Sequence, residues 1–224
     1  MNRLPVVLAI TGASGVIYAL RLLDRLLRSA GTVHLTISPA GRTVLAQELG
    51  IVVDLDRFQA ACLATAPRVD CETDMQRLLR EVQSNLQCSL ADAARLRYHH
   101  YQDFLAPIAS GSFLTGAMVI CPCSGSTLGA VVHGAGSNLV QRAAEVHLKE
   151  RRPLILVPRE TPLSLVQLDN MRRACEAGAV VLPAMPGWYQ GVQSLRELVD
   201  FVVARILDQL GMEHELLSRW GADA

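Results

Sequence analysis

Five short segments of this sequence hold residue types that can bind an anion or move a proton. Each is rich in glycine, hydroxyl, proline or charged side chains and follows a run of apolar residues: 12–15, Ser38, 122–127, 158–162 and 183–189. Apolar runs of this kind predict strands buried on both faces. Because the carboxyl ends of parallel strands line the ligand crevice of an open sheet, we expect all five segments to meet at one edge.

Two of the five segments are typical of helix starts that bind phosphate, because the free N–H groups and the positive dipole end of a helix attract an anion. The first segment contains Gly12, Ala13, Ser14 and Gly15, and the second contains Ser124, Gly125, Ser126 and Thr127. Taken singly, each segment is more typical of simple N-capping. The chain lacks the GxGxxG dinucleotide motif and the Walker GKS/T motif. A mononucleotide such as FMN therefore suits these hydroxyl-rich loops better than NAD or ATP does.

Four basic residues and one acid are candidates to act on such a ligand. Arg159 and Glu160 lie between two prolines, although a neighbouring Arg-Glu pair is usually a solvated turn. Arg205 interrupts an apolar stretch, where an arginine at the rim of a core or interface is an equal alternative. Lys149 ends a helical stretch, where the helix dipole favours a cation. Arg142 can pair with the glutamate one turn further on.

Metal chemistry and nucleophilic catalysis find less support. The adjacent spacing of His99 and His100 cannot place both rings on one metal from a helix face. Cys121 and Cys123 alternate at a strand end and predict buried structural thiols rather than ligands. Ser14 has no evident histidine and aspartate partners, which disfavours a catalytic triad. We therefore expect no bound metal.

The elements that would position these residues alternate between strand and helix. Expected strands cover 6–10, 33–38, 117–121, 153–157 and 179–182, and expected helices cover 16–30, 39–49, 124–132, 139–150, 163–177 and 195–210. This alternation predicts an α/β fold, a single Rossmann-like or flavodoxin-like domain over 1–224 with an open parallel sheet flanked by helices. The segment 55–100 is divergent and mainly helical in pattern, and 205–224 is the end of the last helix and a tail.

The composition excludes several classes of protein. The 224 residues carry 21 Lys+Arg and 21 Asp+Glu, and this formal net charge of +0 disfavours nucleic-acid binding. Hydrophobic residues reach 50%, yet no apolar run is long enough to span a membrane, so the surplus apolar surface indicates a homo-oligomer. The apolar run after Arg3 is too short for a signal peptide. We therefore expect a cytoplasmic protein with reduced thiols.

Four motifs and one long block resemble the UbiX-type flavin prenyltransferases, within the flavoprotein group of cysteine-decarboxylase-like folds. They are ITGASG at 10–15, ASGS at 109–112, CPCS at 121–124, PGWY at 186–189 and the block ERRPLILVPRETP at 150–162. The resemblance covers roughly residues 5–50 and 105–221, whereas 55–100 does not match well.

This resemblance implies that the protein transfers a dimethylallyl group from dimethylallyl monophosphate to reduced FMN, forming bonds at N5 and C6 without a metal. The product, prenylated FMN, would serve UbiD-type decarboxylases. A homo-oligomer is implied as well, a dodecamer built of trimers with its sites at subunit interfaces.

The resemblance also implies a set of site residues. Those binding FMN would be Gly12, Ala13, Ser14, Ser38, Ser124, Ser126, Thr127 and Arg142. Those holding the prenyl donor would be Ser110 and Gly111 from a neighbouring subunit, with Lys149, Arg159, Tyr189 and Arg205, and Trp220 is a candidate to face the allyl cation. The implied catalytic set is Glu160, Glu48, Ser14, Lys149, Arg159 and Tyr189.

Elementary chemistry agrees with these roles. Without Mg²⁺, fixed lysine and arginine donors must stabilise the charge that accumulates on a departing phosphate. Glu160 is an acceptor for the proton that leaves the flavin carbon when the ring closes.

Two rival functions remain open. One is an FMN-dependent decarboxylase of the same fold, which would use a histidine base and an Asn/Met-rich substrate clamp that this sequence lacks. The other is a non-catalytic FMN-binding module. It would retain the two helix-start segments, 12–15 and 124–127, but lose Arg159, Glu160, Tyr189 and Arg205. All four residues are present, which favours the enzyme.

Overall fold

Runs of aliphatic residues form the parallel strands that the sequence predicts. The computed structural model describes residues 4–29, 31–65, 73–189 and 191–217. Its strands are β1 (Val6–Ile10), β2 (Val33–Ile37), β3 (Leu96–Tyr98), β4 (Ala117–Cys123), β5 (Leu154–Pro158) and β6 (Val180–Val181). They pair in parallel in the order β3-β2-β1-β4-β5-β6. The predicted α/β fold with an open parallel sheet is therefore confirmed.

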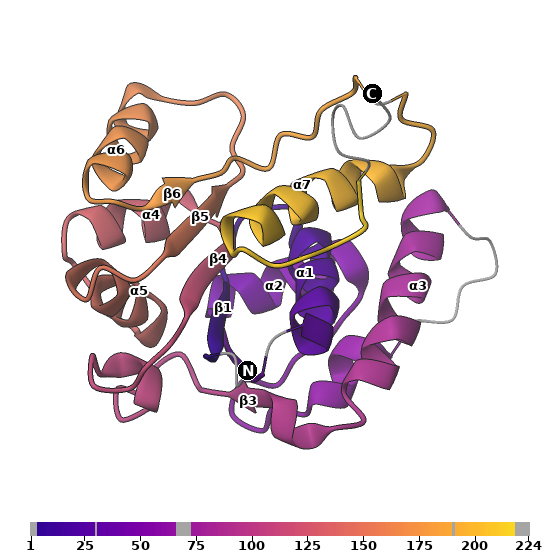
Figure 1. The fold of residues 1–224 in the computed structure, drawn as a ribbon, viewed down its shortest axis with the longest axis horizontal. Helices are drawn as coiled ribbons and strands as arrows, with labels where there is room; N and C mark the ends of the chain where they lie inside the picture. The colour runs from indigo at the N-terminus through magenta and orange to yellow at the C-terminus, as the bar shows by residue number, and fades with distance from the viewer. Residues whose placement is uncertain (1–3, 30, 66–72, 190, 218–224) are drawn as a thin grey trace.

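Helices cover both faces of this sheet (Figure 1). They are α1 (Val16–Ser29), α2 (Pro39–Leu49), α3 (Asp74–Ser89), α4 (Gly125–Val132), α5 (Leu139–Lys149), α6 (Leu165–Glu176) and α7 (Leu195–Gln209), with short 3₁₀ turns at Ala60–Ala64, Ala93–Arg95 and Pro107–Ala109. Helices α1, α3 and α7 pack on one face, and α4, α5 and α6 pack on the other. None of the described helices is long and apolar enough to cross a lipid bilayer.

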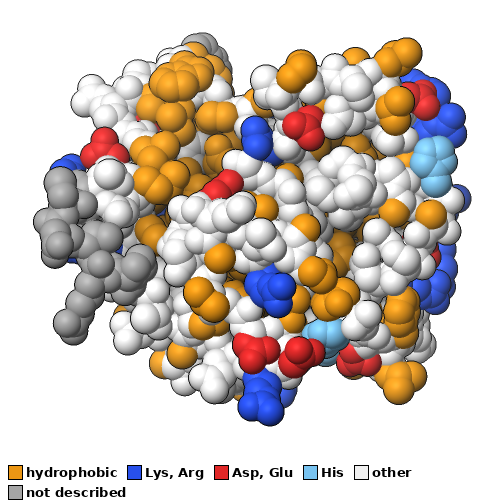
Figure 2. All heavy atoms as spheres, turned by 180° about the vertical axis from the view of Figure 1, so that it is seen from behind, with side chains coloured by type: hydrophobic (Ala, Val, Ile, Leu, Met, Phe, Trp, Pro, Cys, Tyr) orange, Lys and Arg blue, Asp and Glu red, His pale blue; other side chains and the backbone are white. Residues whose placement is uncertain are grey.

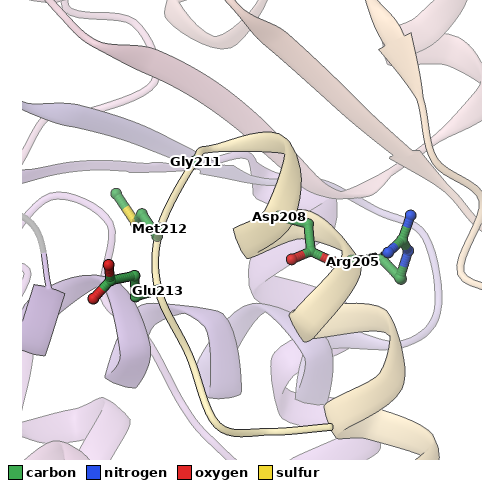
Figure 3. Close-up of a pocket in the computed structure, with 5 residues that line it drawn as sticks. All are labelled: Arg205, Asp208, Gly211, Met212 and Glu213. Carbon is green, nitrogen blue, oxygen red and sulfur yellow. Dashed lines mark hydrogen bonds and ion pairs between the residues drawn. The ribbon is translucent and has the colours of Figure 1, made fainter. Parts of the chain in front are cut away.

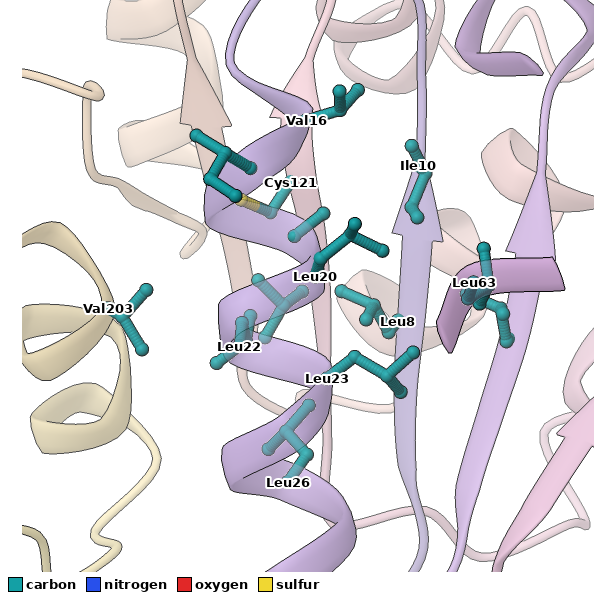
Figure 4. Close-up of a cluster of buried hydrophobic side chains, with 14 of the residues drawn as sticks. Leu8, Ile10, Val16, Leu20, Leu22, Leu23, Leu26, Leu63, Cys121 and Val203 are labelled. Carbon is teal, nitrogen blue, oxygen red and sulfur yellow. The ribbon is translucent and has the colours of Figure 1, made fainter. Parts of the chain in front are cut away.

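Helix α1 is the centre of the larger core. Its leucines recur at helical spacing, so Leu20, Leu23 and Leu26 are fully buried against the side chains of β1 (Figure 4). Val203 of α7 faces the same helix from the other side. Each fully buried leucine contributes about 1.5–3 kcal/mol of transfer free energy. This packing fixes the loop before α1 relative to the sheet.

Buried charges also join α1 to α7. The Arg21 guanidinium donates to Asp200 over 2.7 Å and 3.1 Å and contacts Asp24 over 3.4 Å. All three side chains are almost completely buried. Interaction with Asp200 raises the pKa of Arg21 although burial opposes it. Removing one member of such a buried pair leaves an uncompensated charge, which makes these positions intolerant of single substitutions.

The middle of the chain departs from the predicted structure. The sequence predicts mainly helix over 55–100, and α3 confirms part of this, but β3 (Leu96–Tyr98) adds a strand that was not predicted. It pairs with β2 at the sheet edge, with Leu35 opposite Tyr98. Three residues are too few to show strand periodicity, so tertiary pairing decides their conformation. Residues 66–72 lie outside the described part of the chain.

A histidine pair beside the edge strand β3 predicts that the fold is sensitive to acid. His34 Nδ1 lies 2.8 Å from His99 Nε2, and the two rings stack. Burial first, then the charges of His99 and Arg97, lowers the pKa of His34 to about 4. The unfolded chain, with an ordinary histidine pKa, therefore binds more protons between pH 6.5 and pH 4, so stability falls as the pH falls through this range.

We expect His34 to account for a loss of up to about 2 kcal/mol of unfolding free energy between pH 7 and pH 4.5. Urea denaturation at the two pH values measures this loss. In His34→Gln, which cannot titrate, the loss between the two pH values should shrink. An equal loss in both proteins would show that other groups cause the acid sensitivity.

Candidate active site

The five candidate segments lie where the carboxyl ends of the parallel strands meet, as the sequence predicts. We call this side of the sheet the carboxyl edge. They follow β1, β2, β4, β5 and β6 in turn, and these strands are parallel. The edge therefore collects Gly12–Gly15, Ser38, Ser124–Thr127 and the Arg159–Glu160 pair. Backbone hydrogen bonds tie the neighbouring segments together, because Ser38 N donates to Ile10 O and Thr11 N donates to Pro122 O.

Thr11 joins the two glycine- and serine-rich loops through its side chain. Its buried hydroxyl donates to Pro122 O over 2.8 Å and accepts from Ser124 N over 2.8 Å. Gly12 lies so close to α2 that an added Cβ would fall 2.4 Å from the Cβ of Ala40. Gly15 adopts a positive φ of 103°, a conformation that favours glycine. The loop therefore has one shape, set by contacts within the chain.

Glu48 supplies the anion at the start of α1. Its carboxylate accepts from Gly15 N over 2.9 Å and from Val16 N over 3.1 Å. The sequence assigns these N–H groups to a ligand phosphate, whereas in the structure the Glu48 carboxylate accepts from them. The spacing of 33 residues hides this contact from sequence reasoning. Of the two residues before Gly15, Ala13 is buried and Ser14 is half-buried. The FMN-binding roles expected for Gly12, Ala13 and Ser14 stay predictions.

The start of α4 carries the hydroxyl cluster. Ser124 is the N-cap, and its Oγ accepts from Thr127 N over 3.3 Å. The same oxygen lies 3.1 Å from Ser126 Oγ and 2.9 Å from Thr127 Oγ1. Ser38 likewise caps α2 by accepting from Gly41 N over 3.0 Å. The capping role offered for the segment Ser124–Thr127 is thus confirmed. The exposed Ser126 hydroxyl and the first N–H groups of α4 fit a phosphate well.

The loop after β5 presents Arg159 and Glu160 at the same edge. Both side chains are exposed. Glu160 accepts from Thr161 N over 3.3 Å and from the side-chain amide of Gln167 over 3.2 Å. That amide also lies over Gly125, because a Cβ there would fall 3.3 Å from Gln167 Nε2. Glu160 is therefore held close to the hydroxyl cluster at the start of α4.

Tyr18 is a further residue of this edge that the sequence analysis did not select. Its ring covers Gly15, at 2.9 Å from the position of an added Cβ. Burial, reinforced by Cys121, raises the pKa of its phenol, and the charge of Arg159 opposes this rise. An aromatic residue in the first turn after a glycine loop is the only signal that the sequence offers for it.

A second group of candidate residues lies at the opposite edge of the sheet. Lys149 ends α5 just before β5, and Gly111 precedes β4, so both lie at the amino ends of strands. Lys149 pairs with Glu150 directly over Gly111, where a Cβ would fall 2.7 Å from Lys149 Nζ. Ser110 adjoins them, with its Oγ 2.9 Å from that of Ser112. One chain therefore cannot bring Lys149 to Arg159.

Arg142 belongs with this second group rather than with the glycine loops. Its Nε donates to Ala109 O over 3.1 Å, in the loop that leads to Ser110, and its guanidinium lies 3.8 Å from Glu145. The pairing with the glutamate one turn on, which the sequence offers as an alternative, is thus confirmed.

Tyr189 and Arg205 lie along the outer side of α7. The Tyr189 ring meets Phe201 edge to face at 6.0 Å, and Arg205 follows one turn later. Arg205 borders a pocket of about 470 Å³ with Asp208, Gly211, Met212 and Glu213 (Figure 3). The Arg205 side chain is 52% exposed and pairs with Asp208 over 2.7 Å, which agrees with the alternative of an arginine at the rim of the core. Trp220 lies outside the described residues.

The buried environment predicted for the two cysteines at the end of β4 is confirmed. Cys121 and Cys123 are fully buried, and burial raises the pKa of both thiols, that of Cys123 to about 12. His99 bonds to His34 and not to its neighbour His100. Among the described residues, no group of three or more His, Cys, Asp or Glu side chains is placed to hold a metal ion.

Large apolar side chains are exposed near both edges. Leu165 and Val166 of α6, with Met185 and Trp188, lie beside the carboxyl edge, and Phe104, Leu105 and Leu114 lie in the loop before β4. Figure 2 shows apolar side chains over much of the rear face, with charged side chains between them and along its rim. Exposed apolar side chains on a chain without net charge are typical of a protein–protein contact.

Known proteins resemble this chain over nearly its full length. The model of the Flavoprotein family matches residues 1–207. The flavin prenyltransferase UbiX of Pseudomonas aeruginosa is 48% identical over 216 residues, which cover 96% of this chain and 93% of that protein. The flavin prenyltransferase UbiX of Halalkalibacterium halodurans is 41% identical, with 96% and 92% covered.

Two solved structures share the fold and about a third of the sequence. AnUbiX (PadA1), in complex with FMN and dimethylallyl pyrophosphate, superposes with a TM-score of 0.75 at 32% identity over 98% of each chain. A dodecameric FMN-dependent UbiX-like decarboxylase from Escherichia coli O157:H7 gives a TM-score of 0.74 at 33% identity, over 97% of this chain and 99% of that one. The peptidyl-cysteine decarboxylase EpiD, at 11% identity and a TM-score of 0.55, shares the fold alone.

Proposed function

Because the chain belongs to the Flavoprotein family, we propose that it is a flavin prenyltransferase that joins a dimethylallyl group to reduced FMN at N5 and C6. The observation that carries this proposal is 48% identity to such an enzyme over nearly the whole chain. The gathering of the glycine, hydroxyl and Arg-Glu segments at one sheet edge supports it. Prenylated FMN would be the product, made for a UbiD-type decarboxylase. A cytoplasmic location stays a prediction from the sequence.

The residues at the carboxyl edge fit FMN. Since Glu48 already satisfies the start of α1, the phosphate of FMN is best placed at the start of α4, where Ser124, Ser126 and Thr127 present hydroxyls. The loop Gly12–Gly15, which lies beside it through Thr11, would then take the rest of the flavin nucleotide. Ser38 caps α2 next to the same loop and borders this space.

The cations serve the prenyl donor. A phosphate that leaves an allyl group accumulates negative charge, and Arg159, Arg205 and Lys149 would stabilise it as fixed donors. Tyr189 would add a neutral O–H donor. Glu160 would accept the proton lost from the flavin carbon, and its exposed carboxylate next to the start of α4 is suitably placed for this.

The site must draw on more than one copy of the chain. Lys149, Ser110 and Gly111 lie at the opposite sheet edge from Arg159 and Glu160, so they would reach the donor only from a neighbouring copy. The exposed apolar side chains at both edges provide the surface for that contact. A contact between two different edges is head-to-tail, and it closes into a ring when the rotation between successive copies permits. Dimethylallyl monophosphate is the expected donor, and a dodecamer of trimers the expected assembly.

Anaerobic incubation with reduced FMN and dimethylallyl monophosphate tests the function. Mass spectrometry of the released flavin should show a mass increased by one dimethylallyl group, and the absorbance spectrum should change with ring closure. Oxidised FMN and donor-free samples are the controls. Unmodified flavin together with released carbon dioxide from a cysteine-containing peptide would instead support the decarboxylase.

Arg205→Ala is expected to weaken binding of the prenyl donor while FMN binding persists. One charged donor to the leaving phosphate stabilises the transition state by about 2–4 kcal/mol, so kcat/KM should fall about 30- to 1000-fold. Because Arg205 is exposed and its ion pair lies at the surface, the thermal stability should change little.

Arg172→Ala is the matched control for Arg205→Ala. Arg172 is also an exposed helical arginine with carboxylate partners, Asp169 and Glu176, but it lies on α6 outside the candidate site. We expect it to retain wild-type kcat/KM. A stable Arg205→Ala protein with unchanged donor KM and kcat would remove Arg205 from the site.

A further inference from the structure

Gln167 has a side-chain amide whose orientation is fixed by the helix that it starts. It occupies the third position of α6, and its Oε1 accepts from Ser164 N over 2.8 Å while Ser164 Oγ accepts from Gln167 N over 3.3 Å. This capping box assigns the oxygen end of the amide to the backbone. The NH₂ end, which can only donate, must therefore face the other way.

The fixed NH₂ group faces Glu160. Gln167 Nε2 donates to Glu160 Oε2 over 3.2 Å, and Thr161 N donates to the other carboxylate oxygen over 3.3 Å. The same Nε2 lies over Gly125, at the start of α4. The amide thus lies between the carboxylate and the hydroxyl cluster, and it restrains an exposed side chain that could otherwise turn into solvent or toward Arg159.

We propose that Gln167 is a positioning residue that holds the Glu160 carboxylate, in its proton-accepting form, beside the start of α4. This inference rests on the proposed function, in which Glu160 takes a proton from the flavin carbon as the ring closes. A donor on the carboxylate favours the charged form, which is the form that accepts a proton. Gln167 does not touch the reacting atoms, so its effect is confined to the step that uses Glu160.

The variant Gln167→Glu separates positioning from folding. A glutamate at this position keeps the capping box, because its oxygen still accepts from Ser164 N. It replaces the NH₂ donor with a second carboxylate oxygen directed at Glu160. Ser164→Ala is the matched control, since it removes the hydroxyl of the cap but leaves the Gln167 amide and its bond to Glu160 in place.

Rapid-quench kinetics should show a selective defect in Gln167→Glu. We expect ring closure to slow about tenfold at pH 7, because repulsion from the second carboxylate turns Glu160 away from the start of α4. The acid limb of the pH profile should also move up, because a like charge disfavours the ionised base. The new carboxylate also lies beside the start of α4, so the affinity for FMN should fall. At saturating FMN, the rate of the first bond should stay within about twofold of wild type, since no cation that serves the leaving phosphate is changed. Ser164→Ala should keep the wild-type profile.

A second measurement needs no turnover. Carbodiimides react with protonated carboxyls, so labelling of Glu160, followed by peptide mass spectrometry at pH 6–7, should be faster in Gln167→Glu than in wild type and in Ser164→Ala. Equal labelling in all three proteins, or an unshifted pH profile, would overturn the positioning role. If the wild-type chain makes no prenylated FMN, the proposed function fails, while the labelling still decides whether Gln167 controls Glu160.

Discussion

Glu160→Gln should halt the reaction between its two bond-forming steps. The first bond, at flavin N5, requires a leaving phosphate, which Arg159 and the other cations serve. The second bond forms as the double bond of the prenyl group takes up a proton and flavin C6 loses one. A cation cannot accept the proton that leaves C6. Glutamine keeps the size of the side chain but cannot take a proton at neutral pH. We therefore expect normal FMN binding, a normal first step and ring closure slowed by about 10²–10⁴-fold.

Quenched samples analysed by mass and absorbance distinguish the two products, because both have the same added mass but only the closed ring has the final spectrum. Glu176→Gln, an exposed glutamate on α6, is the control and should turn over normally. Ring closure at the full rate in Glu160→Gln would show that the released phosphate, or Glu48, is the base.

Mixed assemblies of two inactive variants should recover activity. Lys149→Ala and Arg159→Ala each remove a cation from the site, and each alone should lose at least about 10²-fold in kcat/KM. If a site takes Lys149 from one copy and Arg159 from another, random co-assembly leaves about one quarter of the sites with both residues intact. Co-expression with two different tags, followed by tandem purification and assay, measures this recovery.

The matched control is the mixture of Arg159→Ala with Glu160→Gln. These two residues belong to one loop, so every site in that mixture carries one defect or the other, and no recovery is expected. If co-assembled Lys149→Ala and Arg159→Ala remain inactive, Lys149 does not complete a site that contains Arg159 from another copy.

The sequence predicts the edge of the sheet that carries the chemistry because strand order does not matter for that inference. Any parallel arrangement places Gly12–Gly15, Ser124–Thr127 and Arg159–Glu160 at the carboxyl ends of their strands. The N-caps Ser38 and Ser124 are also local features, visible within a few residues. Short-range patterns thus suffice for the loops and for most helices.

The parts that sequence reasoning missed depend on contacts between distant residues. Glu48 reaches Gly15 across 33 residues, and no local pattern shows that its carboxylate, rather than a ligand, meets the start of α1. The position of Lys149 beside Gly111 follows only from the direction of α5 relative to β4. The exposure of Arg205 depends on which side of α7 packs against α1.

The carboxylate of Glu48 has a further consequence for the thermodynamics of cofactor capture. Its bonds to Gly15 and Val16, with those of Thr11 to Pro122 and Ser124, fix the loop Gly12–Gly15 through the chain's own atoms. A ligand that enters a loop already held in its final shape loses little conformational entropy of the protein, so more of the contact energy remains as affinity. Association should accordingly proceed as rigid docking, at a rate set by encounter rather than by rearrangement of the loop.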